Sequence, residues 1–301
     1  MKNMNKYENC LLCPRKCGIN RRTGQTGVCG VSSEIKVARA ALHYWEEPCI
    51  SGKRGSGAVF FSGCSLHCVF CQNREISDGK EGKVISKERL SDIFMELADK
   101  GANNINLVTP GQYIPDIVWA VNDAKSRGMK LPIIYNTSGY ENVTELKLLE
   151  GIVDVYLPDF KYMDSTLSAM YSRAKDYPSV AKQALSEMVR QQPDVVIDDA
   201  TGLIQKGVIV RQLLLPGHVN DAKAILKYLH DTYQDSIYIS MMSQFTPIAL
   251  KDYPEINRTV TRREYERLID YAIKIGITNA FIQEGNVAKD SFIPAFDGEG
   301  V

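Results

Sequence analysis

Seven short apolar segments, separated by helical patterns, constrain the fold of this chain more than any other sequence feature. They are rich in β-branched and aromatic residues, as buried strands are. Their ranges are 58–61, 105–108, 132–135, 153–157, 207–215, 236–242 and 279–283. Strands that alternate with helices over this much of a chain predict a parallel sheet with right-handed crossovers. In such folds the chemistry lies at the carboxyl ends of the strands.

Helical spacing of apolar residues predicts helices over 87–101, 114–128 and 264–276, each of which ends at a glycine. Thr261 and Glu264 have the spacing of a capping box before the last helix. Residues 163–206 form a mostly helical insertion with a hairpin around 198–202, and residues 34–46 alternate like a strand. Six or seven units predict an α/β fold, an incomplete (β/α)6-type parallel barrel, with a C-terminal extension.

The composition excludes several classes of protein. The chain has 301 residues, 44% of them hydrophobic, and this is enough for a large core. Its 36 basic and 36 acidic residues balance, so no nucleic-acid partner is expected. No apolar run approaches the roughly 20 residues that span a bilayer, so no membrane partner is expected. The polar N-terminus lacks the apolar centre of a signal peptide. We therefore expect a cytoplasmic protein.

All eight cysteines fall within the first 71 residues. Disulfide scaffolds distribute cysteines across a small secreted domain, whereas crowded thiols in a reducing compartment more often bind metal. The placement predicts two parts: a cysteine-rich, metal-binding lobe with a lead-in strand at 1–50, and the barrel core with its extension at 51–301.

Cys64, Cys68 and Cys71 have the spacing C-x3-C-x2-C and directly follow the segment 58–61. Three thiolates on one short loop can hold three irons of a [4Fe–4S] cluster and leave the fourth iron open to another ligand. An electron carrier would normally complete the set. The alternatives are a zinc site with a distant fourth ligand, and free thiols.

A second set of four cysteines lies in the N-terminal lobe: Cys10, Cys13, Cys17 and Cys29. Four thiolates suit either a closed tetrahedral zinc site or a second iron–sulfur cluster, and free thiols are the remaining interpretation. Zinc would stabilise a lobe that has little core of its own. Cys49 has no assigned role and is expected to be a buried thiol.

The cysteine triad resembles the signature of the radical S-adenosylmethionine (SAM) superfamily, C-x3-C-x-aromatic-C, in which Phe70 supplies the aromatic residue. The resemblance implies a [4Fe–4S] cluster on the three catalytic cysteines Cys64, Cys68 and Cys71. It also implies that SAM chelates the open iron and is cleaved reductively to a 5′-deoxyadenosyl radical, which abstracts hydrogen from a substrate.

The same resemblance implies SAM-binding positions near the ends of later strands. Thr109, Pro110 and Gly111 stand where the family usually has a Gly-Gly-Glu-like segment. Asn136 and Thr137 end the third strand, Asp159 and Lys161 follow the fourth, and Arg211 lies in an apolar run. Lys161 would hold the SAM carboxylate. Glu284 and His218 are weaker candidates.

The segments CLLCPRKC, GCSLHCVFCQN, LPDFKY and FIQEG together resemble the pyruvate formate-lyase activating-enzyme-like family, in its branch with an N-terminal cysteine cluster. This implies an electron donor such as flavodoxin or ferredoxin and a protein substrate, a glycine of a glycyl radical enzyme. Two other functions stay open. One is a radical SAM enzyme that modifies a small molecule or RNA, and the other is a non-catalytic iron–sulfur or zinc protein.

Overall fold

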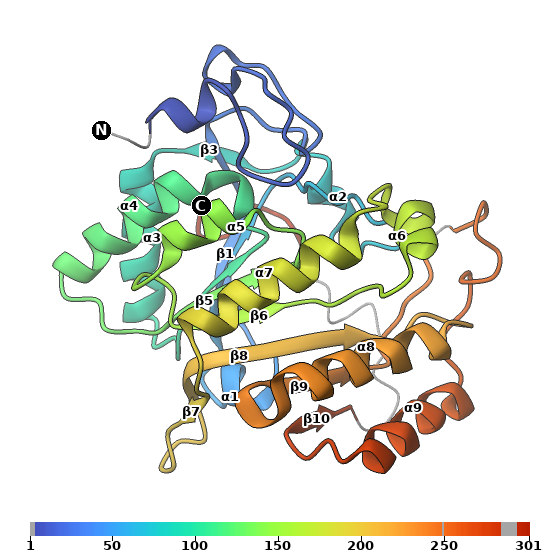
Figure 1. Ribbon diagram of the computed structural model, residues 1–301. Coiled ribbons are helices and arrows are strands. Elements are labelled where there is room, and N and C mark those ends of the chain that lie inside the picture. Colours follow the sequence, from blue (N-terminus) through green and yellow to red (C-terminus); the bar gives the residue numbers. More distant parts are fainter. Residues whose placement is uncertain (1–3, 249, 284–293) are drawn as a thin grey trace.

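A single large sheet organises the computed structural model, which describes residues 4–248, 250–283 and 294–301 (Figure 1). The described residues form ten strands, in the sheet order β10-β9-β8-β6-β5-β4-β2-β1-β3, with β7 paired to β8. The strands are β1 Ile35–His43, β2 Ser56–Phe61, β3 Lys83–Ile85, β4 Ile105–Val108, β5 Ile133–Thr137, β6 Val155–Pro158, β7 Val196–Ile197, β8 Ile204–Leu213, β9 Tyr238–Met242 and β10 Ala280–Ile282.

The strands from β2 to β10 along this order are all parallel, and the edge at β1 and β3 is antiparallel. In the described part of the chain, β3 and β10 are the two ends of the order and do not pair. The sheet therefore stays unclosed, as a partial barrel of the radical SAM type does. This confirms the predicted fold class.

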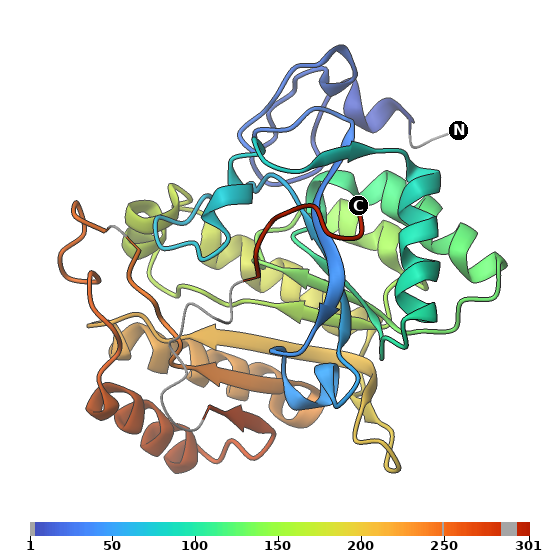
Figure 2. The ribbon, with the colours of Figure 1, turned by 180° about the vertical axis from the view of Figure 1, so that it is seen from behind.

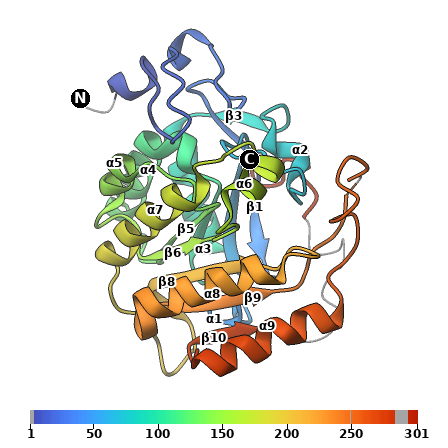
Figure 3. The ribbon, with the colours of Figure 1, turned by 45° about the vertical axis from the view of Figure 1, so that its right-hand side comes forward.

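Helices fill the connections between the parallel strands. Figure 3 shows α7 and α8 lying across one face of the sheet. The helices are α1 Pro48–Ser51, α2 Arg74–Ser77, α3 Lys87–Asp99, α4 Ile114–Ser126, α5 Val143–Leu146, α6 Ser165–Ser172, α7 Tyr177–Gln191, α8 Val219–Tyr233 and α9 Arg262–Ile275. Short 3-10 turns lie at Met4–Tyr7, Arg21–Thr23, Gly111–Tyr113, Lys147–Leu149 and Gln234–Ser236. None of the described helices combines the length and apolarity needed to cross a membrane.

The main core lies between these helices and the sheet, and a smaller cluster fills part of the opposite face. In the smaller cluster, Cys49 and Ile50 of α1 pack with Ile134, Val155 and Leu157. Cys49 is therefore a buried thiol within an apolar cluster, in agreement with its default interpretation. Burial raises the pKa of this thiol to about 12.

Each of the seven predicted strands is present, with its bounds shifted by a few residues at most. The three predicted helices correspond to α3, α4 and α9, and the predicted hairpin corresponds to the antiparallel pair β7–β8. The sequence analysis did not name α8 or the short strand β3. The three residues of β3 are not buried, and so short a run is too brief to show a strand pattern, so it is the pairing with β1 that identifies the strand.

The N-terminal lobe packs against the sheet's helices through partly buried polar contacts. The Lys6 ammonium lies 2.6 Å from the Glu145 carboxylate, and the Tyr7 hydroxyl donates to Asp116 at 2.5 Å. Figure 2 shows the C-terminal segment beside β1. There the Gly298 amide donates to the Ala38 carbonyl at 3.1 Å. Residues 6 and 7 and the C-terminal segment are thus held against the core.

The capping box at the start of α9 gives a stability prediction. Thr261 Oγ1 accepts the Glu264 amide, and the Glu264 carboxylate accepts the Thr261 amide. We expect Thr261→Ala to lower the free energy of unfolding by about 1 kcal/mol, because an orphan amide of the first turn loses its acceptor. Urea unfolding would measure this loss. Thr261→Ser keeps the oxygen and should lose far less, and equal losses in both variants would contradict the prediction.

Candidate active site

A cavity of about 220 Å³ collects most of the predicted site residues. It is lined by Cys64, Cys68, Phe70, Cys71, Thr109, Asn136, Thr137, Asp159, Lys161 and Arg211. These residues follow or end β2, β4, β5 and β6, or lie on β8, so the parallel sheet brings together positions that are far apart in the chain. Pro110 lies outside this lining, and Gly111 lines a neighbouring cavity instead. Glu284 lies outside the described residues.

The cysteine loop leaves β2 at Gly63, where the backbone conformation and the available space allow only glycine. Gly63 has φ of +87°, and a Cβ there would lie 2.7 Å from the Cys29 carbonyl oxygen. The next turn is closed by the Cys71 amide, which donates to the Cys68 carbonyl at 3.1 Å. His67 also has a positive φ, 49°, and its Nε2 lies 2.6 Å from the Val28 carbonyl oxygen. The loop is therefore shaped by contacts with the N-terminal lobe.

The chemistry of the three thiols fits ligation of a metal. Burial raises the pKa of Cys64, and it raises the pKa of Cys71 to about 12, with neighbouring thiols adding to both effects. A coordinating metal removes the thiol proton outright. Three sulfur donors on one loop, facing a cavity with polar walls, fit a [4Fe–4S] cluster in their donor chemistry.

Across the described residues, no three His, Cys, Asp or Glu side chains are gathered closely enough to ligate a single metal ion. Both cysteine sets instead line cavities.

A buried ionic network forms part of the wall of the same cavity. Asp159 accepts from Lys161 Nζ at 2.6 Å and from Arg211 Nε at 3.1 Å. Burial alone would raise the pKa of Asp159, but the two cations hold it below its usual range. The side chains of Lys161 and Arg211 are only 15% and 14% exposed, so these ion pairs are largely shielded from solvent, unlike surface ion pairs, which contribute little to stability.

Glu46 belongs to the network, although the sequence analysis missed it. Its carboxylate accepts from Arg211 Nη1 at 3.1 Å and from Asn106 Nδ2 at 3.0 Å. Arg211 Nη2 also donates to Asn136 Oδ1. The sequence held only an indirect indication of this partner. A buried arginine needs anionic partners, and Asp159 is shared with Lys161, so a second carboxylate was to be expected near Arg211. Arg211 is therefore satisfied by protein groups, whereas Asp159 is the only hydrogen-bond acceptor of the Lys161 ammonium within the described structure.

Thr109 has a strained backbone at the end of β4. Its φ of 57° is left-handed, which is rare for a β-branched residue. The surroundings hold it there: its amide donates to the Asn136 carbonyl at 2.9 Å, and its carbonyl accepts from Gln112 Nε2 at 2.9 Å. Strain of this kind concentrates at functional sites, and Thr109 lines both cavities.

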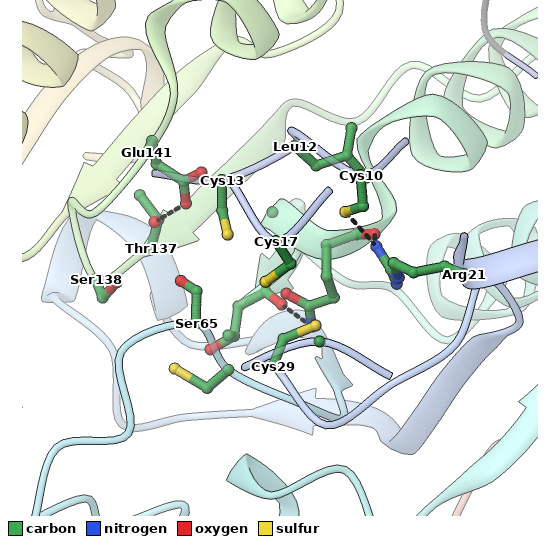
Figure 4. A pocket seen from close by; sticks show the side chains of 15 residues that line it. Cys10, Leu12, Cys13, Cys17, Arg21, Cys29, Ser65, Thr137, Ser138 and Glu141 are labelled. Atoms are coloured by element: carbon green, nitrogen blue, oxygen red, sulfur yellow. Dashed lines mark hydrogen bonds between the residues drawn. The ribbon is translucent and has the colours of Figure 1, made fainter. Parts of the chain in front are cut away.

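The second cavity lies between the N-terminal lobe and the barrel (Figure 4). Its volume is about 20 Å³, and all four lobe cysteines line it: Cys10, Cys13, Cys17 and Cys29. Burial raises the pKa of Cys13 to about 12. Gly27 lets the chain pass Cys17, because a Cβ there would lie 2.9 Å from its sulfur. Cys64 lines both cavities, so the cavity of the lobe cysteines and the cavity of the cysteine triad share part of their lining.

Arg21 is a buried cation beside these thiols, and it is only 1% exposed. It donates to the carbonyls of Gln112 at 2.8 Å, Ser32 at 2.5 Å and Val31 at 3.2 Å, and it lies 3.9 Å from Cys10 Sγ. In the part of the chain that the structure describes, no carboxylate pairs with it. A buried cation is costly without negative charge nearby, and ionised lobe thiols would supply that charge.

Residues 58–206 match the family model of the Radical SAM superfamily. An uncharacterized protein of Methanocaldococcus jannaschii is 28% identical over 281 residues, which cover 91% of this chain and 77% of that protein. Streptococcus suis SuiB bound to S-adenosylmethionine is a similar solved structure, with 14% identity and a TM-score of 0.49 over 74% of this chain and 48% of that chain. A radical SAM methyltransferase from Sphaerobacter thermophilus has 16% identity and a TM-score of 0.49, over 76% of this chain and 66% of that chain. This chain thus spans less than half of the SuiB chain.

His43 gives a pH prediction for this site. Burial, then the charges of Arg39 and Arg211, lower the pKa of His43 to about 4 from an ordinary 6.5. Because the unfolded chain takes up this proton at higher pH, the stability that depends on neutral His43 is complete above pH 6.5 and is lost between pH 6.5 and 4. We expect His43→Gln to flatten the pH dependence of the unfolding free energy in that window. Denaturant unfolding at several pH values measures it, and an unchanged slope would refute the assignment.

Proposed function

We propose, from the premise that residues 58–206 form a radical SAM superfamily domain, that this chain is a radical SAM enzyme whose cluster is held by Cys64, Cys68 and Cys71. The observation that carries the proposal is the single cavity in which these thiols face the polar ends of successive parallel strands. When bound there, a [4Fe–4S] cluster and SAM would supply reductive cleavage to a 5′-deoxyadenosyl radical and hydrogen abstraction from a substrate.

The chain's own residues would bind and orient SAM. Lys161 would hold the SAM carboxylate, because Asp159, its one acceptor among the described residues, is also neutralised by Arg211. Asn136 and Thr137 line the same cavity at the end of β5. The strained Thr109 backbone turns the chain at the end of β4, where Pro110 and Gly111 stand in place of the usual Gly-Gly-Glu-like segment. The buried walls would exclude water from the reacting groups.

The proposed substrate is a protein, namely a glycine of a glycyl radical enzyme, and the proposed electron donor is a flavodoxin or ferredoxin. The resemblance to activating enzymes supports this substrate, and the unclosed sheet leaves a side through which a polypeptide loop could enter. A radical SAM enzyme acting on a small molecule or RNA is the second candidate. Measuring which labelled substrate transfers hydrogen to the 5′-deoxyadenosyl radical, and so into 5′-deoxyadenosine, would separate the candidates.

The four lobe cysteines are proposed to hold a metal centre of their own, zinc or a second cluster. Their thiols share one cavity, and the buried Arg21 beside them needs compensating negative charge. A zinc or iron–sulfur centre with four thiolates is an anion, so it would supply that charge. The division into a lobe at 1–50 and a core at 51–301 belongs to this proposal, with the qualification that β1 pairs with β2 in the main sheet.

SAM cleavage tests the main proposal. The anaerobically reconstituted and reduced protein should convert SAM to 5′-deoxyadenosine, and Cys64→Ala, Cys68→Ala and Cys71→Ala should each abolish the product, because each removes an iron ligand. Chromatography of the nucleoside products measures this. Cys49→Ala is the matched control, since its thiol is buried in an apolar cluster, and it should retain cleavage. No product from the wild-type protein with a reduced cluster would overturn the proposal.

Metal content tests the lobe site. In a variant with Cys64, Cys68 and Cys71 all replaced by Ala, we expect either about one equivalent of zinc per chain or iron with matching sulfide. Arg21→Met should lower this metal content, because the anionic centre loses its buried counter-charge. Arg22→Met, at an exposed neighbour in the same turn, should leave it unchanged. Elemental analysis that finds no metal in the triple variant would rule out the lobe site.

A further inference from the structure

The end of helix α6 lies against the cysteine loop, although the two are far apart in the sequence. The Val69 amide donates to the Tyr171 carbonyl at 2.9 Å, which fixes the loop to the last turn of the helix. The next residue, Ser172, is fully buried, and its hydroxyl donates to Cys68 Sγ at 3.1 Å. A residue of the helical insertion thus hydrogen-bonds a sulfur of the cysteine triad.

A second hydroxyl continues this contact into the core. Tyr162 OH lies 2.7 Å from Ser172 Oγ, and Tyr162 is fully buried. A metal-bound thiolate can only accept a hydrogen bond, and Ser172 lies in position to donate its single proton to Cys68. In this arrangement Tyr162 donates to Ser172 Oγ, and Ser172 donates to the sulfur.

Arg15 of the N-terminal lobe holds this arrangement in place. Its Nη2 donates to the Ser172 carbonyl at 3.0 Å, and its Nη1 donates to the Arg173 carbonyl at 2.6 Å. Its Nε donates to the carbonyl of Ser65 in the cysteine loop at 2.8 Å. One guanidinium thus joins the helix end to the loop, so the position of Ser172 relative to Cys68 is constrained from both sides.

We propose that Ser172, oriented by Tyr162, raises the reduction potential of the cluster held by the cysteine triad. This inference rests on the proposed radical SAM function. Reduction adds negative charge to the cluster and its sulfurs, and a donor to a ligand sulfur stabilises the reduced state more than the oxidised state. Ser172 is a positioning and tuning residue, since it acts through Cys68 and not on SAM or the substrate.

A redox titration of the reconstituted holoenzyme, followed by visible absorbance and electron paramagnetic resonance, tests the proposal. In Ser172→Ala we expect the ratio of reduced to oxidised cluster at a fixed potential to fall about tenfold, a shift of about 59 mV to more negative potential for a one-electron couple. Tyr162→Phe should shift it in the same direction by less. Ser172→Thr keeps a hydroxyl and should restore most of the wild-type potential.

The matched control is Ser168→Ala. Ser168 is also fully buried in α6, but its hydroxyl donates to the Ser165 carbonyl, so its removal should leave the potential unchanged. Iron and sulfide are measured first. A wild-type protein that binds no cluster would overturn the proposed function itself. A Ser172→Ala protein that binds the cluster and has the wild-type reduction potential would overturn only this inference. If Ser172→Ala does not bind the cluster, a wild-type reduction potential in Tyr162→Phe would overturn the inference instead.

Discussion

The contacts of the Arg211 guanidinium hold together the wall of the candidate active-site cavity. It reaches Asp159 after β6, Glu46 after β1 and Asn136 on β5, so one side chain joins four parts of the sheet. Removing one member of a buried ion pair typically costs about 3–5 kcal/mol, because the other charge stays buried without a partner. The network is therefore a structural requirement of this wall, and Lys161 belongs to it through Asp159.

The N-terminal lobe is as much a part of this site as the barrel is. Gly63 can pass Cys29 only without a side chain, His67 contacts the Val28 carbonyl, and Arg15 joins the cysteine loop to α6. Cys64 lines the cavities of both cysteine sets. A change in the position of the lobe would therefore be transmitted to the loop that carries Cys64, Cys68 and Cys71.

Much of the architecture was predictable because its signals are local. Apolar runs of four to nine residues predicted the parallel strands, and the spacing from Thr261 to Glu264 predicted a cap that the structure confirms. The short strand β3 could not be predicted, since three residues are too few to show a strand pattern and only the pairing with β1 defines it. The cysteine spacings are likewise local, so both candidate ligand sets were visible before any fold was known.

What the sequence by itself determined is the chemistry available: three thiols on one loop, four in a lobe, and polar residues at the ends of parallel strands. Only the tertiary structure decided which groups meet. Glu46 reaches Arg211 across 165 residues, and Ser172 reaches Cys68 across 104. No periodicity or motif encodes such pairs, because they arise from how twisted strands and packed helices bring distant side chains together, where buried polar groups must find partners.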